Sequence, residues 1–157
     1  MPRRLYKKRT ITKDPVYNSL IVAKLINYIM VDGKKSVAKK IVYSVLDEIK
    51  KQGLDPIITL EEVIKNTAPN FEVKPRRLGG ASYMVPIEVR KERKIFLSLN
   101  WIINAAKSRP NKQYKTFTEK ILAEILDAYK NVGQAVAKRQ QTEKLAEANK
   151  AFAHLKW

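Results

Sequence analysis

Cysteine is absent from this sequence of 157 residues, and histidine occurs once, at His154. Without cysteine the chain forms no disulfide, no thiolate metal site and no cysteine nucleophile, and one imidazole near the end of the sequence does not build a histidine-based zinc site. No G-x-S-x-G motif accompanies this histidine, so nothing supports a serine hydrolase. We therefore predict that the protein is not an enzyme and that it holds no metal and no cofactor.

Acidic residues are few compared with basic ones. The sequence has 15 Asp and Glu against 32 Lys and Arg, which gives a net charge of +17. A net charge of roughly 2 to 8 is enough to keep a small domain soluble. The excess positive charge opposes compaction unless a polyanion neutralises it, and the two candidates are nucleic acid and a membrane surface. The sequence also lacks a transmembrane-length apolar run and a secretory signal. Nucleic acid is therefore favoured, and we expect no membrane partner.

Glycine is scarce as well, with five residues, and over most of the chain the apolar residues recur at helical spacing. We predict a mainly α fold: a single helical domain of about six helices with a protruding two-stranded β-hairpin arm. In this interpretation residues 1–13 are a basic N-terminal tail, residues 14–149 are the helical domain with the arm inserted at 71–89, and residues 150–157 are a C-terminal tail.

Local signals give the expected helix boundaries. Asp14 followed by Pro15 predicts the start of the first helix. Residues 59–62 (TLEE) and 116–119 (TFTE) have the pattern of capping boxes, which predicts that the third and fifth helices begin there. Gly133 is expected to be the residue that ends the fifth helix. The last predicted helix is largely polar, so we expect it to lie at the surface or to dock on another molecule.

The predicted arm, residues 71–89, has the alternating pattern of two strands around Gly79 and Gly80. A lone two-stranded ribbon is marginally stable in water, and we expect both of its long edges to stay unpaired. Arg76 and Arg77 lie beside the bend, and guanidinium groups bind phosphate through two hydrogen bonds at once. The arm therefore predicts a polyanionic partner, the alternative being a surface hairpin with solvated charges.

Basic residues gather in five segments that contain almost no acid: the tail, the start of the second helix, the arm, the residues just after it, and the loop before the fifth helix. If these segments share one face, they form a track that neutralises several phosphates at once. The alternative is a compositional bias with a solvated surface. The candidate nucleic-acid-binding residues in these segments are Arg3, Arg4, Lys7, Lys8, Arg9, Lys34, Lys35, Lys74, Arg76, Arg77, Arg90, Arg93, Lys94, Arg109 and Lys115.

Composition alone does not separate RNA from DNA. Folded RNA is recognised by its shape, its phosphates and its unstacked bases, which suits a protein that offers a tail, helix ends and a ribbon. DNA-bending architectural proteins also use β-ribbon arms with proline wedges, and Pro75 and Pro86 keep that alternative open.

Four segments carry a resemblance to a known family. They are MPRR at residues 1–4, MVDGKKS at 30–36 with IVYS at 41–44, EVKPRRLGGASYMVPIEVR at 72–90, and AEANKAFAH at 146–154. In order and spacing they resemble the small-subunit ribosomal protein seven of bacteria and plastids. The resemblance covers nearly the whole chain.

The resemblance implies a helical core with a protruding hairpin, direct binding to the 3′ major domain of small-subunit rRNA, and nucleation of the head of the subunit. It implies a position at the subunit interface, near the mRNA exit path and exit-site tRNA, with ribosomal protein eleven and other head proteins as neighbours and the chain as a monomer within the ribosome. It makes the basic residues above, together with Gly79, rRNA-binding candidates. The candidates that face tRNA or mRNA are Gly80, Ala81, Ser82, Tyr83, Lys138 and Arg139.

One departure from the family lies in the last helix, where QTEKL at residues 141–145 stands in place of the histidine and arginine that relatives commonly carry. This puts the electrostatic contacts of that helix in question. The absence of a transit-like segment leads us to expect the cytoplasm and ribosome of a bacterium, with a plastid ribosome as second choice.

Overall fold

A computed structural model describes residues 10–155 of the chain. In chain order its elements are α1 (Leu20–Ile29), α2 (Lys35–Lys51), α3 (Pro56–Thr67), β1 (Phe71–Leu78), β2 (Ala81–Glu88), α4 (Lys91–Ser108), α5 (Phe117–Tyr129), α6 (Gln134–Ala148) and the short 3-10 helix η1 (Lys150–Leu155). The prediction of a mainly α fold with one two-stranded hairpin is confirmed. Across residues 10–155, no helix combines the length and the apolar character that a membrane span requires.

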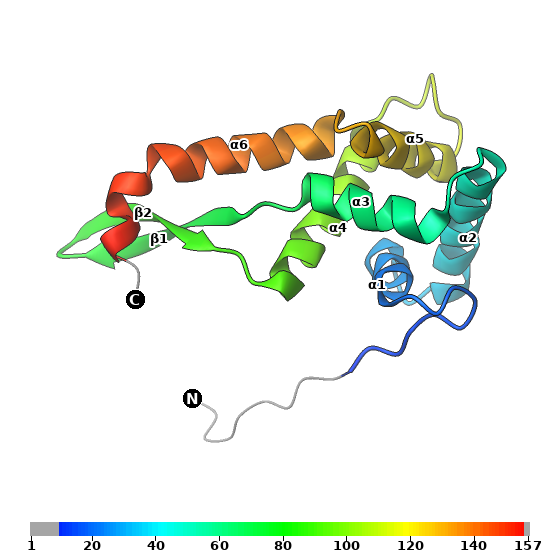
Figure 1. The fold of residues 1–157 in the computed structure, drawn as a ribbon, viewed down its shortest axis with the longest axis horizontal. Coiled ribbons are helices and arrows are strands. Elements are labelled where there is room, and N and C mark those ends of the chain that lie inside the picture. The colour runs from blue at the N-terminus through cyan, green and yellow to red at the C-terminus, as the bar shows by residue number, and fades with distance from the viewer. Residues whose placement is uncertain (1–9, 156–157) are drawn as a thin grey trace.

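Helix α4 is the central helix of the body. Its Leu99, Ile102 and Ala106 are almost completely buried, and it packs against α1, α3, α5 and α6. A helix with neighbours on several sides has little room for polar faces, which explains why its sequence is apolar around most of its circumference. The hairpin extends away from this body, and α6 runs alongside it (Figure 1).

Helix α1 begins at Leu20, so the prediction of a helix start at Asp14 is wrong. The Asp14 carboxylate does accept hydrogen bonds from the backbone N–H groups of Val16 and Tyr17, each at 3.1 Å. The turn that it caps ends at Asn18, whose φ of 46° lies in the left-handed region. Because a left-handed residue interrupts a right-handed helix, the capping signal produces an isolated turn here.

The other two predicted helix starts had different outcomes. Helix α3 begins at Pro56, and the N-cap is Asp55, whose carboxylate accepts from two backbone N–H groups of the first turn. The predicted capping box at 59–62 is therefore wrong, because an Asp-Pro pair begins the helix earlier. The predicted start at 116–119 is confirmed, since the Thr116 hydroxyl accepts from the Glu119 N–H at 3.3 Å.

Gly133 does not end α5, contrary to the prediction. Asn131, with a φ of 60°, takes the left-handed position after that helix, and Gly133, with a φ of 97°, is the N-cap of α6. A Cβ atom at Gly133 would lie 3.1 Å from Oε1 of Glu124. Glycine at this position therefore lets the backbone of the α5–α6 turn lie close to the buried Glu124 carboxylate, because it has no Cβ atom.

The hairpin forms as predicted. Strands β1 and β2 pair antiparallel from Phe71 opposite Glu88 to Leu78 opposite Ala81. The two residues between them, Gly79 and Gly80, have φ values of 56° and 89°. Positive φ at both positions is the requirement of the type I′ turn that best fits the twist of a hairpin.

Helix α6 and η1 cover part of the hairpin. No third strand joins the sheet within the described residues, in keeping with the expected unpaired edges, but α6 packs against β1 and η1 packs against β2. The ring of Phe152 in η1 lies 5.3 Å from the ring of Tyr83, and Val85 is completely buried. The polar last helix therefore docks on the arm of its own chain, and only a few of its residues are buried.

A polar network ties the turn before α1 to helix α2. The Tyr43 hydroxyl donates a hydrogen bond of 2.8 Å to Asp14, and the Tyr17 hydroxyl donates one of 3.2 Å to Asp47. Burial and the hydrogen bond to the Asp14 carboxylate raise the pKa of Tyr43 to about 12. The proton on Tyr43 therefore contributes to the stability of the fold.

We expect the Tyr43→Phe variant to lose a stability contribution that depends on pH. A group whose pKa is raised by folding stabilises the fold below its unfolded pKa, here 10.0, and loses that contribution as the pH rises to about 12. The difference in unfolding free energy between wild type and Tyr43→Phe should thus shrink over this range, as measured by urea unfolding at a series of pH values. Lysines titrate equally in both proteins, so a difference independent of pH would contradict the assignment.

Candidate nucleic-acid interface

A groove that runs along one face of the hairpin, from its base toward its tip, brings together basic side chains from three segments. Lys74 and Arg76 come from β1, Arg90 follows β2, and Arg93 lies in the first turn of α4. The groove has a volume of about 540 Å³. Four of the predicted residues therefore share one concave surface, which a phosphate backbone can enter.

Glu72 lies in the same groove and positions two of its cations. Its Oε1 is 3.0 Å from Nζ of Lys74, and its Oε2 is 3.3 Å from Nε of Arg93. Burial acts most strongly on Glu72 and favours the neutral acid, but the interactions with Lys74 and Arg93 together outweigh it and lower the pKa of Glu72. The carboxylate thus stays ionised, and the groove keeps a net positive charge because its four cations outnumber its two carboxylates, Glu72 and Glu88.

The two arginines near the hairpin tip project to opposite faces of the ribbon. Arg76 lies opposite Tyr83, and Arg77 lies opposite Ser82, so consecutive residues alternate between faces. Arg76 lines the basic groove, whereas Arg77 is exposed on the other face. The arm therefore offers a guanidinium group on each side.

Lys94, next to the groove, is partly engaged within the protein. Its amine donates a hydrogen bond of 2.8 Å to the side-chain oxygen of Asn70. This bond ties the first turn of α4 to the residue before β1. Lys94 therefore supports the base of the hairpin as well as adding charge beside the groove.

A second basic group lies at the opposite end of the body. Lys34 and Lys35 are exposed at the start of α2, and Lys34 lines a pocket together with Lys107 from the last turn of α4 and Phe117 from the start of α5. Lys115, also exposed, lies two residues before Phe117. The predicted set omits Lys107, since only the fold brings it near Lys34.

The two basic groups are joined by helix α4. Arg93 is in its first turn and Lys107 in its last, so at 1.5 Å per residue they are about 21 Å apart along the helix axis. A mononucleotide cannot span that distance. The basic residues therefore form two groups, and a ligand that contacts both must be large.

Arg109 belongs to the predicted set, but its side chain is committed to the interior. Its guanidinium donates to Glu124 at 2.6 and 3.0 Å, to Asp127, and to the Tyr114 hydroxyl at 3.0 Å. Burial, the largest single influence, disfavours its charge, yet the hydrogen bonds to Asp127 and Glu124 raise the pKa of Arg109 overall. We therefore leave Arg109 out of the interface, because an arginine held by two carboxylates has little capacity left for phosphate.

The residues predicted to face tRNA or mRNA lie in different surroundings. Gly80, Ala81 and Ser82 are exposed at the hairpin tip, whereas Tyr83 is half-buried against Phe152. The tip thus presents mainly backbone and one hydroxyl group. Tyr83 contributes by holding η1 against β2.

Lys138 and Arg139 lie on α6. Lys138 is exposed, whereas the Arg139 side chain is only 22% exposed and its Nε lies 3.8 Å from Oε2 of Glu143. Glu143 also accepts from the backbone N–H of Asn70 at 3.3 Å. The Arg139 side chain therefore belongs largely to the contact between α6 and the base of the hairpin.

Five predicted residues of the N-terminal tail lie outside the described part of the chain: Arg3, Arg4, Lys7, Lys8 and Arg9. Between residues 10 and 155 no group of three or more His, Cys, Asp or Glu side chains is arranged to hold a metal ion.

Comparison with known proteins gives consistent matches along the chain. The family model described as ribosomal protein S7p/S5e matches residues 1–150. Proteins named small ribosomal subunit protein uS7 are similar over the full length of both chains: that of Caldicellulosiruptor bescii is 52% identical, that of Carboxydothermus hydrogenoformans 52%, and that of Thermodesulfovibrio yellowstonii 50%.

Proposed function

Because the chain belongs to the ribosomal protein S7p/S5e family, we propose that it is an rRNA-binding component of the small ribosomal subunit that binds the 3′ major domain directly and nucleates assembly of the head. Membership makes it a ribosomal protein with a structural role in translation, in a family that is not enzymatic.

The observation that carries the proposal is the pair of basic groups at the two ends of α4. They are about 21 Å apart along a rigid helix, so a ligand that touches both must carry phosphates at least that far apart. Folded rRNA meets this requirement, since junctions of helices present phosphates in several directions. The net charge of +17 supports the same conclusion.

We assign the rRNA contacts to both groups and to the tail. At the hairpin end they are Lys74, Arg76, Arg77, Gly79, Arg90, Arg93 and Lys94, and at the body end they are Lys34, Lys35, Lys107 and Lys115. The tail contributes Arg3, Arg4, Lys7, Lys8 and Arg9 as further phosphate contacts.

We further propose that the hairpin tip and α6 face the mRNA exit path and exit-site tRNA at the subunit interface. The exposed tip residues Gly80, Ala81 and Ser82 and the exposed Lys138 of α6 form this side, to which Arg139 adds only the 22% of its side chain that is exposed. The glycine allows RNA to approach the backbone closely. Ribosomal protein eleven and other head proteins are the proposed protein neighbours, and the chain is a monomer within the ribosome. The bacterial relatives at 50–52% identity favour a bacterial ribosome over a plastid one.

Binding to DNA is the less favoured alternative. An architectural protein would need its prolines free to wedge between base pairs, but Pro86 is buried and only Pro75 is exposed. The hairpin is also backed by α6 and η1, which limits how far it enters a minor groove. A dimer that bends duplex DNA of many sequences would favour this alternative.

We expect binding to a 3′ major domain rRNA fragment to depend steeply on salt. With about six phosphate contacts or more, affinity should fall by roughly 10³ between 50 and 200 mM salt, because each contact releases counterions. Filter binding or fluorescence anisotropy at four salt concentrations measures the slope. The control is duplex DNA of equal length, and equal affinity for that duplex would contradict the proposal.

A further inference from the structure

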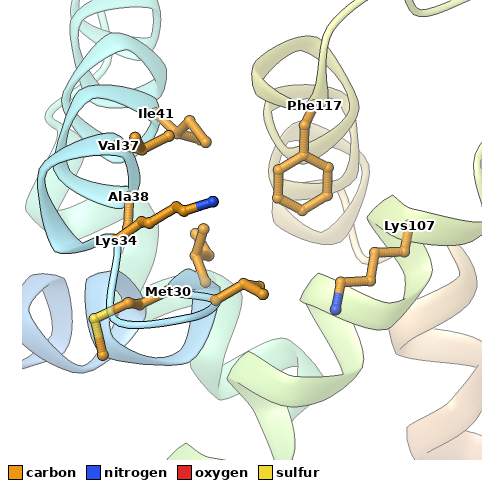
Figure 2. A pocket seen from close by; sticks show the side chains of 9 residues that line it. Met30, Lys34, Val37, Ala38, Ile41, Lys107 and Phe117 are labelled. Carbon is orange, nitrogen blue, oxygen red and sulfur yellow. The ribbon is translucent and has the colours of Figure 1, made fainter.

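The pocket at the body end has apolar walls and two basic residues at its edge. It has a volume of about 320 Å³ and lies where the end of α1, the start of α2, the end of α4 and the start of α5 meet. Figure 2 shows the Lys34 side chain extending toward the Phe117 ring, which projects into the space between the helices, with Lys107 on a third helix. The remaining wall is aliphatic, including Met30, Val31, Val37 and Ile41.

The apolar wall is incompletely covered by the protein itself. Val31 is 61% exposed and Val37 is 52% exposed, although both line the pocket. Phe117 and Ile41 are half-buried. Apolar surface that is left open in a hollow costs free energy in water and is typical of binding sites.

The charges around the pocket have one sign. The lining residues, all within the described part of the chain, include Lys34 and Lys107 and no carboxylate. Among residues 10–155 neither lysine amine has a hydrogen-bond or ion-pair partner. A ligand that matches the pocket would therefore have an apolar face for the wall and anionic groups beside it for the two lysines.

We propose that this pocket binds one unstacked nucleobase of the rRNA, with the neighbouring phosphates held by Lys34 and Lys107. This inference rests on the proposed function and assigns it a site. A base has a flat apolar face that can lie against the Phe117 ring, and a nucleotide strand carries phosphates on both sides of each base. An aliphatic side chain of a protein partner would leave both lysines uncompensated, and a phosphate alone would leave the apolar wall exposed.

The test fills the pocket without removing a charge. We expect Val37→Trp, a change at a half-exposed helix position, to weaken binding to the 3′ major domain fragment about tenfold, because loss of one base–aromatic contact is worth about that much. The slope of affinity against salt should stay the same, since the lysines remain. Val31→Trp in the connecting turn is a second filling variant, and circular dichroism melting checks that each variant is folded.

A series of rRNA fragments, each with one unpaired nucleotide made abasic, locates the base. One abasic position should weaken the wild-type complex about tenfold and leave the Val37→Trp complex unchanged, because the two changes remove the same contact. The matched control is Ile58→Trp, an equally exposed apolar position on α3 outside the pocket, which should bind as wild type does. In a separate arm, removing both lysines with Lys34→Ala and Lys107→Ala should reduce the salt slope by about 1.4 to 1.8.

The outcomes separate this inference from the function on which it rests. If the wild-type protein binds the fragment but both filling variants bind equally well, or if no abasic position couples to Val37→Trp, the pocket does not hold a base. That result would leave the two basic groups and their ligand untouched. If the wild-type protein itself fails to prefer the fragment over duplex DNA, the proposed function fails first.

Discussion

Replacing Arg76 and Arg77 together by alanine should weaken binding to the 3′ major domain rRNA fragment by about 100-fold. Each guanidinium can form charge-assisted hydrogen bonds to phosphate worth about 1.5 kcal/mol or more, and about 1.4 kcal/mol corresponds to a factor of ten. Because the side chains project to opposite faces of the ribbon, they contact different phosphates, so we expect about tenfold from each single variant. Equilibrium binding at fixed salt measures all three losses.

Two controls separate the position of these charges from their number. Lys65→Ala with Lys130→Ala also removes two exposed positive charges, but from positions outside both basic groups, and should cost less than fivefold, roughly a surface electrostatic effect. The double variant Arg76→Lys with Arg77→Lys keeps the charge but loses the paired donors of each guanidinium group. Its affinity should therefore lie between those of the wild type and the double alanine variant. Equal losses for the arginine pair and the lysine pair would show that the arm is not a specific contact.

The largest loss of stability should come from Glu124. This side chain has no exposed surface, accepts two hydrogen bonds from Arg109, and accepts a third, of 3.0 Å, from the backbone N–H of Ala135 in the first turn of α6. Glu124→Ala leaves that N–H unpaired and Arg109 with only Asp127 as a charged partner. Because breaking a buried ion pair costs about 3 kcal/mol or more, we expect the melting temperature to fall by roughly 9 °C.

Urea unfolding and thermal melting measure this effect, and two variants control it. Glu61→Ala removes an exposed carboxylate from α3 and should change the unfolding free energy by less than about 0.5 kcal/mol. Glu124→Gln keeps an oxygen for the Ala135 N–H but loses the charge. Its loss of unfolding free energy should therefore lie between those of Glu61→Ala and Glu124→Ala. A loss below about 1 kcal/mol for Glu124→Ala would mean that the network is not needed for folding.

Those features that depend on neighbouring residues could be predicted from the sequence. The hairpin follows from alternation in residues 71–89 around two glycines, and α5 begins directly after Thr116 because the Thr116 hydroxyl caps the helix by accepting from the Glu119 N–H. The start of α1 could not be predicted in this way, since it depends on the backbone of Asn18. Capping residues indicate that a turn begins, but only the packing that follows decides whether a helix continues from it.

Features that join distant parts of the chain could not be predicted. Arg109 was expected to bind nucleic acid because it lies in a basic loop, but Glu124 and Asp127 lie in α5 and take its donors. Lys107 and Lys34 share a pocket although a long stretch of sequence separates them. A charge pattern gives the number of cations, whereas the fold decides which of them have carboxylate partners.

The packing of α6 and η1 on the hairpin has a consequence for the order of events during synthesis. Residues 71–88 leave the translating ribosome well before residues 134–155, which supply the surfaces against which β1 and β2 pack. Since an isolated hairpin is marginally stable in water, the emerging arm lacks its support until the last helix has been made. The arm therefore gains its rigid shape only after residues 134–155 have been made, as one of the final steps of maturation.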